Sequence, residues 1–270
     1  MEEASALPLC ILRLSPMGGR RRVWPTIAPH LSLSRVRARS RPHEANLAPR
    51  LSSNLLRAQV GLSHFEVRPS TFEETLDKAA FPSGAAYAVA TARAKAAEVA
   101  AAVRAGMGAS PTSHALVLAA DTVVQAPDGT ILEKPDDDAH AVRMLTSLAG
   151  GTHTVHTGCS LVVLPPPLAE QGGEGAPPPS QQQQQQQRAT FIEFSETTAV
   201  TFAPLSPGEI AAYVATGEAA GKAGGYGIQG AAGVWVSRLD GCYFNVVGLP
   251  LHALGREVAG LVEAGVIGLK

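Results

Sequence analysis

Hydrophobic and polar residues alternate or repeat in regular periods from about residue 54 onward, and these periods predict strands and helices. Residues 64–68 alternate and stop at Pro69, as a short strand does. Residues 84–105 are rich in alanine with interspersed charges, which predicts a helix. The apolar run 116–120 is typical of a fully buried strand. We expect this strand to present Asp121 at its carboxyl end.

The second half of the chain contains further elements of both kinds. Ser206 and Glu209 have the spacing of a capping box, in which each side chain binds the backbone of the other residue at a helix start. Pro250 suits the first turn of a final helix. The remaining predicted elements are a helix over 136–150 and strands over 153–164, 190–202 and 234–236. Because strands and helices are interspersed, the predicted fold class is α/β, of the mixed α+β kind.

Residues 1–45 show neither period, and prolines interrupt a composition rich in arginine and serine. Residues 1–58 hold ten arginines, no lysine and three acids, which is typical of leaders that target a plastid or mitochondrion. Glu2 and Glu3 argue against such a leader, because transit peptides avoid acids. We therefore expect residues 1–45 to be a disordered or targeting leader. Residues 46–270 then form one domain, cytoplasmic or within an organelle.

A low-complexity segment interrupts this domain at residues 165–188. It contains two runs of three prolines, several glycines and seven consecutive glutamines. Such a segment cannot bury enough apolar area to fold. Because it lies between two predicted strands, we interpret it as a disordered insertion at the tip of a hairpin.

Charge and composition argue against several classes of protein. The chain has 22 Lys and Arg against 23 Asp and Glu, but beyond residue 58 it has 12 bases and 20 acids. So acidic a body does not suit a protein that wraps nucleic acid. Three widely spaced cysteines provide neither a disulfide framework nor a zinc-binding spacing, which indicates a reducing compartment. No apolar run reaches about 18 residues, so we expect no membrane span.

Three features are candidates for chemistry. Asp121 follows a buried strand, where open α/β sheets bind ligands, and its carboxylate can hold a divalent cation, take a proton from water or simply cap the next turn. Lys134 precedes Pro135 in a short loop and suits a charge aimed at phosphate, although a lone lysine commonly serves solubility. The loop 224–230 is dense in glycine, and Gln229 offers a donor and an acceptor for a base edge.

Two histidines are weaker candidates for a metal site. His153 and His156 are three residues apart on a predicted strand, so their side chains point to opposite faces. They therefore cannot chelate one metal ion together.

Several short segments occur in a characteristic order along the chain. They are Phe65–Ser70, Glu73–Glu74, Ala92–Ala96, Ala120–Val124, Ile131–Pro135, Arg143–Leu145, Gly150–Gly158, Gly217–Glu218, Lys222–Gly230 and Asn245–Leu251. In this order they resemble the Maf family of nucleoside triphosphate pyrophosphatases. The resemblance covers about residues 54–262 apart from the insertion. Residues 65–78 look especially like the Maf-type domain that animals fuse to a methyltransferase-like domain.

The resemblance implies a fold and a reaction. The fold is a mixed α/β structure shared with the inosine triphosphate pyrophosphatases, with a central mixed sheet and a cleft, and it usually forms a homodimer. In the reaction, water attacks the α-phosphorus of a nucleoside triphosphate and yields monophosphate and pyrophosphate. The implied partners are a nucleoside triphosphate and a second copy of the chain, with no nucleic acid and no membrane.

The family's catalytic and metal-binding residues carry over to matching positions. By resemblance, Asp121 is the base that takes a proton from a water polarised by Mg²⁺ or Mn²⁺. Glu74 helps Asp121 to hold that metal. Lys95 and Lys134 neutralise the charge that moves onto the pyrophosphate leaving group.

Two further positions match those with which the family selects the base, Thr122 and Gln229. The branch that acts on dTTP and UTP carries glutamine in the glycine loop, whereas relatives that prefer 7-methyl-GTP carry an acid. The resemblance therefore implies dTTP, UTP and modified pyrimidine analogues as substrates. The alternative is an enzyme of the same fold that is specific for purine triphosphates, and Gln229 argues against it.

The chain departs from the family pattern at two places. The family's first loop reads Ser-Pro-Arg-Arg and grips the phosphates, but the matching positions here retain at most one arginine, Arg50. The family's aspartate before Lys222 is Gly221. These losses support a competing hypothesis, in which the protein is a catalytically impaired pseudoenzyme that binds a nucleotide or a partner.

Overall fold

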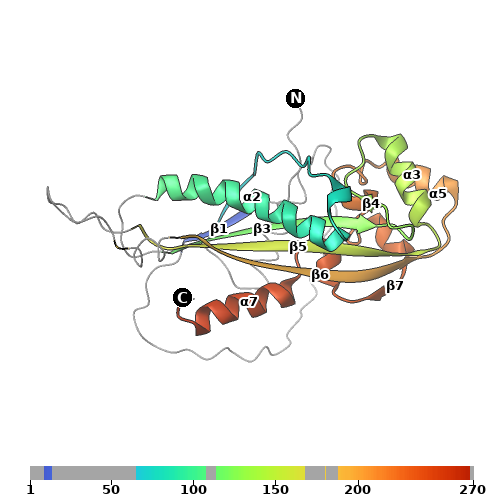
Figure 1. The fold of residues 1–270 in the computed structure, drawn as a ribbon. Helices are drawn as coiled ribbons and strands as arrows, with labels where there is room; N and C mark the ends of the chain where they lie inside the picture. The colour runs from blue at the N-terminus through green and yellow to red at the C-terminus, as the bar shows by residue number, and fades with distance from the viewer. Residues whose placement is uncertain (1–8, 14–64, 108–113, 168–179, 181–187, 268–270) are drawn as a thin grey trace, which may run out of the picture.

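The framework of the protein is an antiparallel β-sheet (Figure 1). The computed structural model describes residues 9–13, 65–107, 114–167, 180 and 188–267. The strands follow the spatial order β2-β1-β3-β5-β6-β7, and the short β4 pairs with β3 beside this path. Their bounds are β1 Leu9–Arg13, β2 Phe65–Arg68, β3 Ala115–Gln125, β4 Ile131–Leu132, β5 Thr152–Leu164, β6 Thr190–Phe202 and β7 Val236–Asp240.

Helices cover both faces of this sheet (Figure 1). Helix α2 lies across one face and α7 across the other, while α3 and α5 pack together near β4. The α-helices are α2 Gly84–Gly106, α3 Asp138–Leu148, α5 Pro207–Val214, α6 Tyr243–Val247 and α7 Leu251–Glu263, and the short 3₁₀ helices are η1 Lys78–Ala80, η2 Ala223–Gly225 and η3 Ala231–Trp235. The arrangement confirms the predicted α/β class. Within the described ranges, no helix has the length and apolarity that a bilayer span requires.

Side-chain caps begin the helices close to the predicted positions. Ser83 accepts a hydrogen bond from the backbone N–H of Ala86 at the start of α2. Asp137 caps α3 in the same way, and Ser206 with Glu209 forms the predicted capping box of α5. Each cap satisfies an N–H group that has no partner within the first helical turn.

Strands β5 and β6 form a long hairpin that runs through the middle of the sheet. Their register pairs Thr152 with Thr201 at one end and Val163 with Thr190 at the other. This pairing confirms the strands predicted over 153–164 and 190–202. The segment 165–188 joins adjacent ends of the two strands, as a hairpin tip does, and most of it (168–179 and 181–187) lies outside the described residues.

Alternation along β3 divides its side chains between the two faces of the sheet. Val117 belongs to the hydrophobic cluster beneath α2, whereas Leu116 belongs to the cluster that contains Leu254 of α7. By the same alternation, Asp121 faces α2 and Thr122 faces the α7 side. This division decides which residues can meet Asp121.

Strand β3 is longer than the apolar run that predicted it. It continues through Asp121 to Gln125, because these residues pair with Gly158–Thr154 of β5 and the last two also pair with β4. We had expected Asp121 at the carboxyl end of this strand, but it lies within the strand.

Three other expectations differ from the structure. The strand predicted over 234–236 is largely replaced by η3, after which β7 begins at Val236. Each pairing between described strands is antiparallel, whereas a mixed sheet was expected.

Residues 1–45 were expected to hold no regular element, yet the five-residue β1 lies between β2 and β3. Residues 9–12 are consecutive apolar residues without alternation, so no strand period marks them. The rest of residues 1–45 lies outside the described part of the chain.

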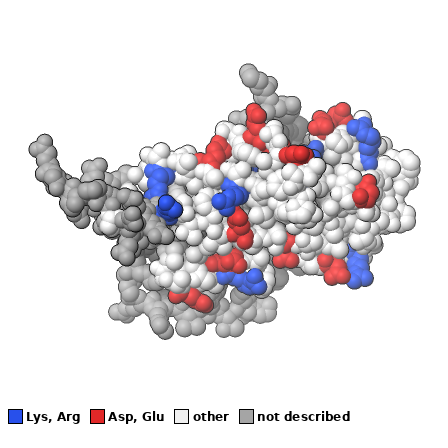
Figure 2. Space-filling view, in the orientation of Figure 1, with Lys and Arg blue, Asp and Glu red and all other residues white. Residues whose placement is uncertain are grey.

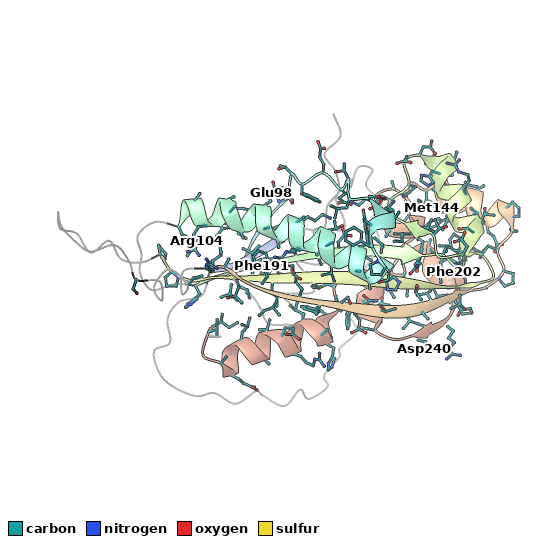
Figure 3. All side chains as sticks on the ribbon, viewed as in Figure 1. Glu98, Arg104, Met144, Phe191, Phe202 and Asp240 are labelled. Carbon is teal, nitrogen blue, oxygen red and sulfur yellow. The ribbon has the colours of Figure 1, made fainter. Side chains whose placement is uncertain are left out.

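Charged side chains are scattered over the face of the molecule shown in Figure 2, with acidic and basic groups interspersed. Among the described residues on this face, no broad basic surface is present of the kind that nucleic-acid binding requires. Met144 of α3 and Phe202 of β6, both labelled in Figure 3, belong to one hydrophobic cluster, which also contains residues of α5.

The close approach of α2 to the sheet depends on Gly158, which pairs with Asp121 across β5 and β3. A Cβ atom at Gly158 would lie 2.2 Å from the backbone nitrogen of Val89 and 2.3 Å from the carbonyl carbon of Ala88. The missing side chain lets α2 lie directly on the sheet beside Asp121. Lys95 follows Ala88 by about two helical turns, so this contact also sets the height of Lys95 above the sheet.

We expect Gly158→Ala to lower the free energy of unfolding by about 1–3 kcal/mol or more, the usual cost of overpacking, because α2 has to move off β5. The control is Gly260→Ala in α7, where a Cβ meets nothing within 4 Å. Alanine favours a helix over glycine by about 1 kcal/mol, so this variant should not lose stability. Urea unfolding measures both variants, and equal stabilities would contradict the packing argument.

Candidate active site

A buried ionic cluster joins α2, β3 and two loops. The ammonium group of Lys95 on α2 lies 2.7 Å from Oδ1 of Asp121 on β3 and 2.8 Å from Oε1 of Glu74 in the loop after β2. The ammonium group of Lys134, in the loop after β4, lies 3.1 Å from the same oxygen of Glu74. The structure thus brings together four of the predicted site residues from four separate segments.

Lys95 lies in the buried stripe of α2, among alanine and other small side chains. Its side chain is 1% exposed, and the side chain of Asp121 is 8% exposed. A buried ammonium or carboxylate is costly unless an opposite charge and hydrogen bonds compensate it. The ion pairs of Lys95 with Asp121 and Glu74 provide that compensation.

Burial and neighbouring charges set the protonation of the cluster. Burial raises the pKa of Asp121 above its ordinary value, and the Lys95 ammonium only partly offsets this rise. Burial by itself would lower the pKa of Lys95, but the carboxylates of Asp121 and Glu74 outweigh it and raise this pKa. Burial by itself would raise the pKa of Glu74, but the two lysines outweigh it and lower this pKa. Lys95 and Glu74 are therefore charged at neutral pH, and Asp121 accepts a proton more readily than an exposed aspartate does.

Glu133 holds the loop that carries Lys134. Its carboxylate accepts a hydrogen bond of 2.6 Å from the hydroxyl of Tyr87 on α2 and lies 2.5 Å from the ammonium of Lys78. Its carbonyl oxygen accepts a hydrogen bond of 3.0 Å from the backbone N–H of Gly224. The Lys134 loop is therefore tied to α2 on one side and to the glycine loop on the other.

The glycine loop, residues 224–230, packs against the end of β3. Gly224 has φ +67°, and a Cβ at this position would lie 2.8 Å from Cγ2 of Val124. Glycine is needed here both for the left-handed backbone and for the close contact. Gln229, which follows in the same loop, is exposed.

Glu218 holds the end of the glycine loop next to Gln229. Its carboxylate accepts hydrogen bonds from the backbone N–H of Ala231 at 3.1 Å and from the hydroxyl of Tyr213 at 3.2 Å. A Cβ at Gly230 would lie 1.7 Å from Oε1 of Glu218, so the loop passes directly over this carboxylate.

Thr122 lies on the opposite face of the sheet from the ionic cluster. Its hydroxyl is 2.9 Å from that of Thr157, which in turn donates a hydrogen bond of 3.0 Å to the carbonyl oxygen of Asn245. Val124, against which the glycine loop packs, lies on this same face of β3 by alternation. Thr122 and Val124, against which the glycine loop that carries Gln229 packs, thus share one face, and the ionic cluster lies on the other.

One stretch of β3 has no partner among the described strands on the side away from β5. On this side β1 pairs with residues 115–118, and β4 pairs with residues 124 and 125. Among the described strands, none pairs with residues 119–123 there. Asp121 and Thr122 both lie in this interval, on opposite faces of the sheet.

Comparison with known proteins shows the family of this chain. Residues 52–261 match the family model described as Maf-like protein. The chain belongs to the Maf family. This finding confirms the resemblance that the motifs indicated.

Curated relatives in the Maf family have names that describe one activity. A dTTP/UTP pyrophosphatase of Moorella thermoacetica is 41% identical over 207 residues, which cover 77% of this chain and 88% of that protein. A dTTP/UTP pyrophosphatase of Salinibacter ruber is 42% identical over 225 residues, which cover 82% and 92%. A human protein named probable bifunctional dTTP/UTP pyrophosphatase/methyltransferase is 39% identical over 217 residues, which cover 80% of this chain but only 31% of the human protein.

The two departures from the Maf pattern differ in what the structure says of them. Arg50 lies outside the described residues. Gly221 is described, and its φ of +69° is a left-handed conformation that glycine adopts without strain. The glycine therefore fits its local backbone, although it supplies no carboxylate.

Some residues that shape this Maf site were missed by sequence reasoning. Glu133 and Glu218 each hold a loop, but a single glutamate in a loop carries no distinctive pattern. Gly158 did carry a signal, because a glycine within a strand often marks a close approach of another backbone. The contact partner of Gly158, however, becomes visible only in the tertiary structure.

Glu74 and Asp121 suit a divalent cation that brings further ligands with it. Their oxygens that contact Lys95 are no more than about 5.5 Å apart, because each lies within 2.8 Å of the same nitrogen. Among the described residues, no group of three His, Cys, Asp or Glu side chains is arranged to hold a metal. Mg²⁺ commonly binds through one or two carboxylates together with water and substrate phosphates. The donor set of the Maf site fits that second kind of binding.

His153 fastens the glycine loop from within the core. Its Nε2 lies 2.8 Å from the hydroxyl of Tyr226, and its ring packs edge-on against Phe202. His156 instead lies beside Gly84 of α2, which confirms that the two histidines occupy opposite faces. Burial lowers the pKa of His153 from 6.5 to about 4.

The low pKa of His153 predicts a pH dependence of stability. Between pH 6.5 and about 4, the unfolded chain binds a proton that the folded chain excludes, so the free energy of unfolding should fall by roughly 2–3 kcal/mol as the pH is lowered. His153→Phe keeps an aromatic ring but cannot titrate, and its stability should fall less over this range. Urea unfolding from pH 7 to 4 measures this, with the exposed His252→Gln as the control that follows the wild type. Parallel curves for all three proteins would show that His153 is not the group responsible.

Proposed function

We propose that this protein hydrolyses nucleoside triphosphates to nucleoside monophosphates and pyrophosphate. The observation that carries the proposal is the ionic cluster of Lys95, Asp121, Glu74 and Lys134, in which two lysines meet two carboxylates. The names of the Maf relatives, dTTP/UTP pyrophosphatase, support the same reaction.

The charges of the cluster suit a phosphate substrate. Two ammonium groups from different segments converge on one carboxylate oxygen of Glu74, so both lie near the same point. Fixed cations of this kind stabilise the negative charge that develops on transferred phosphoryl groups. In the proposed reaction, Lys95 and Lys134 bind the phosphate oxygens and receive the charge of the departing pyrophosphate.

Asp121 is the residue that we propose as the base. Its raised pKa brings it nearer to the range in which a carboxylate accepts a proton efficiently. Oxygen from water forms the new bond to the α-phosphorus, the proton goes to Asp121, and the electron pair of the broken phosphorus–oxygen bond leaves with pyrophosphate. Glu74 and Asp121 would hold Mg²⁺ or Mn²⁺ together with the substrate phosphates. When bound, such a metal polarises water and neutralises phosphate charge.

The positions of Asp121 and Thr122 on opposite faces of β3 support a division of the substrate between these two faces. The phosphates would lie with the ionic cluster on the α2 face, and the base would lie toward Thr122 and the glycine loop. Glu133 connects the two regions, because it contacts α2 through its side chain and Gly224 through its backbone. Under this proposal Gln229 reads the base edge and favours pyrimidines.

We expect pyrophosphate release from dTTP, UTP and 5-methyl-UTP with Mg²⁺ or Mn²⁺ present, and much less from 7-methyl-GTP and ITP.

Asp121→Asn keeps the shape of the side chain but cannot take the proton, so kcat should fall by at least about 100-fold. The control is Asp240→Asn on β7, where the carboxylate is exposed and pairs with surface Arg238. Release of pyrophosphate is measured with a coupled assay, and unfolding curves verify that both variants are folded.

Full activity of Asp121→Asn would exclude Asp121 as the base. No release from any nucleotide by the folded wild type would instead favour the pseudoenzyme, in which Gly221 and the altered phosphate loop have removed activity but not binding. Nucleotide binding measured by calorimetry then distinguishes a pseudoenzyme from a protein that has lost the pocket.

We further expect Gln229→Glu to change the order of substrate preference. A glutamate cannot donate the hydrogen bond that the glutamine amide offers, so a base that accepts it loses a partner. The ratio of kcat/KM for dTTP to that for 7-methyl-GTP should fall by about tenfold or more. Because Gln229 is exposed, we expect this substitution to leave the fold intact. An unchanged ratio would show that Gln229 does not select the base.

A further inference from the structure

The segment that carries Glu74 has no regular secondary structure of its own. It runs over residues 69–77, between β2 and η1, and passes above α2 (Figure 1). A loop of this kind lacks the ladder of hydrogen bonds that holds a strand or helix in place. Its position must therefore be set by contacts to neighbouring elements, and Glu74 is only as well placed as those contacts allow.

Glu98 on α2 supplies the contacts at the beginning of this loop (Figure 3). Its carboxylate accepts hydrogen bonds from the backbone N–H groups of Thr71 at 3.1 Å and Phe72 at 3.0 Å. The hydroxyls of Ser70 and Thr71 also donate to it. An ionised carboxylate offers about four acceptor sites, so these donors saturate Glu98. The hydrogen bonds outweigh the effect of burial and lower the pKa of Glu98, which keeps it ionised at neutral pH.

Glu98 and Lys95 hold the loop at two points from one helix. They are three residues apart on α2 and therefore share a face of that helix. Lys95 binds Glu74 directly, at 2.8 Å, whereas Glu98 binds the residues that precede it. Glu74 is the second residue after Phe72, which is about 7 Å of extended chain. A displacement at Phe72 is therefore passed on to Glu74.

We propose that Glu98 is a positioning residue for the hydrolytic site, which places the Glu74 carboxylate against Lys95 and Asp121 by clamping residues 70–72 to α2. This inference rests on the proposed function, in which Glu74 helps to hold the metal with the substrate phosphates. Among the described residues, Glu98 forms hydrogen bonds with Ser70, Thr71 and Phe72 and not with Lys95, Asp121 or Lys134, so it acts through the loop and not on the reacting atoms.

The test compares Glu98→Ala with the wild type in the Mn²⁺ dependence of dTTP hydrolysis. Loss of a supporting residue around a metal ligand typically costs about 10–100-fold, so the Mn²⁺ concentration for half-maximal activity should rise at least about tenfold. Glu98→Gln retains one acceptor oxygen and should restore part of this loss. On the Glu74→Gln background, Glu98→Ala should add no further change, because the group that it positions is already gone.

Glu193→Ala is the matched control for this experiment. Glu193 also binds a side chain of α2, Arg93, but it lies on β6 away from the Glu74 loop. Its removal should leave the Mn²⁺ dependence unchanged. An unchanged dependence in Glu98→Ala, or an equal further loss on the Glu74→Gln background, would overturn the proposal.

Hydrogen exchange separates this inference from the proposed function. In the wild type the amides of Thr71 and Phe72 should exchange slowly, and in Glu98→Ala they should exchange at least about tenfold faster together with the following residues up to 77. This result supports the clamp even if no nucleotide is hydrolysed. Equal exchange in both proteins would show that Glu98 does not hold the loop, whatever the activity.

Discussion

The ammonium group of Lys95 lies between the carboxylates of Asp121 and Glu74, and the arrangement of the site depends on it. A lysine 1% exposed within an alanine-rich helix would be costly without opposite charges beside it. Asp121 on the sheet and Glu74 in a loop provide these charges, so the helix, the sheet and the loop are held at one point. The same contacts keep Lys95 and Glu74 ionised while burial raises the pKa of Asp121. The contacts among Lys95, Asp121 and Glu74 thus hold three segments together and also set the charges that the proposed chemistry needs.

The packing of α2 makes this ionic contact geometrically feasible. Gly158 has no side chain at the position that pairs with Asp121, so α2 rests on the backbone of β5. Glu98 and Tyr87, on the same helix, bind the Glu74 loop and the Lys134 loop respectively, the latter through Glu133. Helix α2 therefore acts as the common support for both loops. A rigid helix can support both loops better than the loops can support each other. Hydrogen bonds from one helix keep Glu74 and Lys134 in fixed positions relative to one another.

Much of the fold was predictable from local patterns. The alanine-rich run predicted α2, and alternation with a proline stop predicted β2, because these signals lie within a few consecutive residues. Where a pattern depends on a partner strand, prediction was less accurate. β3 extends beyond its apolar run because β5 and β4 continue to pair with it. β1 was missed because its apolar residues are consecutive and show no alternation. The stretch predicted as a strand near Trp235 begins as a 3₁₀ helix, and its strand starts only at Val236.

By itself, the sequence determined the family and the α/β class. It also identified four candidate site residues, Asp121, Lys95, Glu74 and Lys134. Motifs in a specific order are enough for this, because they can be recognised without knowing which residues are in contact. The tertiary structure decided which of the candidates meet. It placed those four in one buried cluster and Thr122 on the opposite face, since neighbouring residues on a strand point to opposite sides. It also revealed the supporting roles of Glu98, Glu133 and Gly158. These roles consist of contacts between residues distant in the chain, and no local pattern records such contacts.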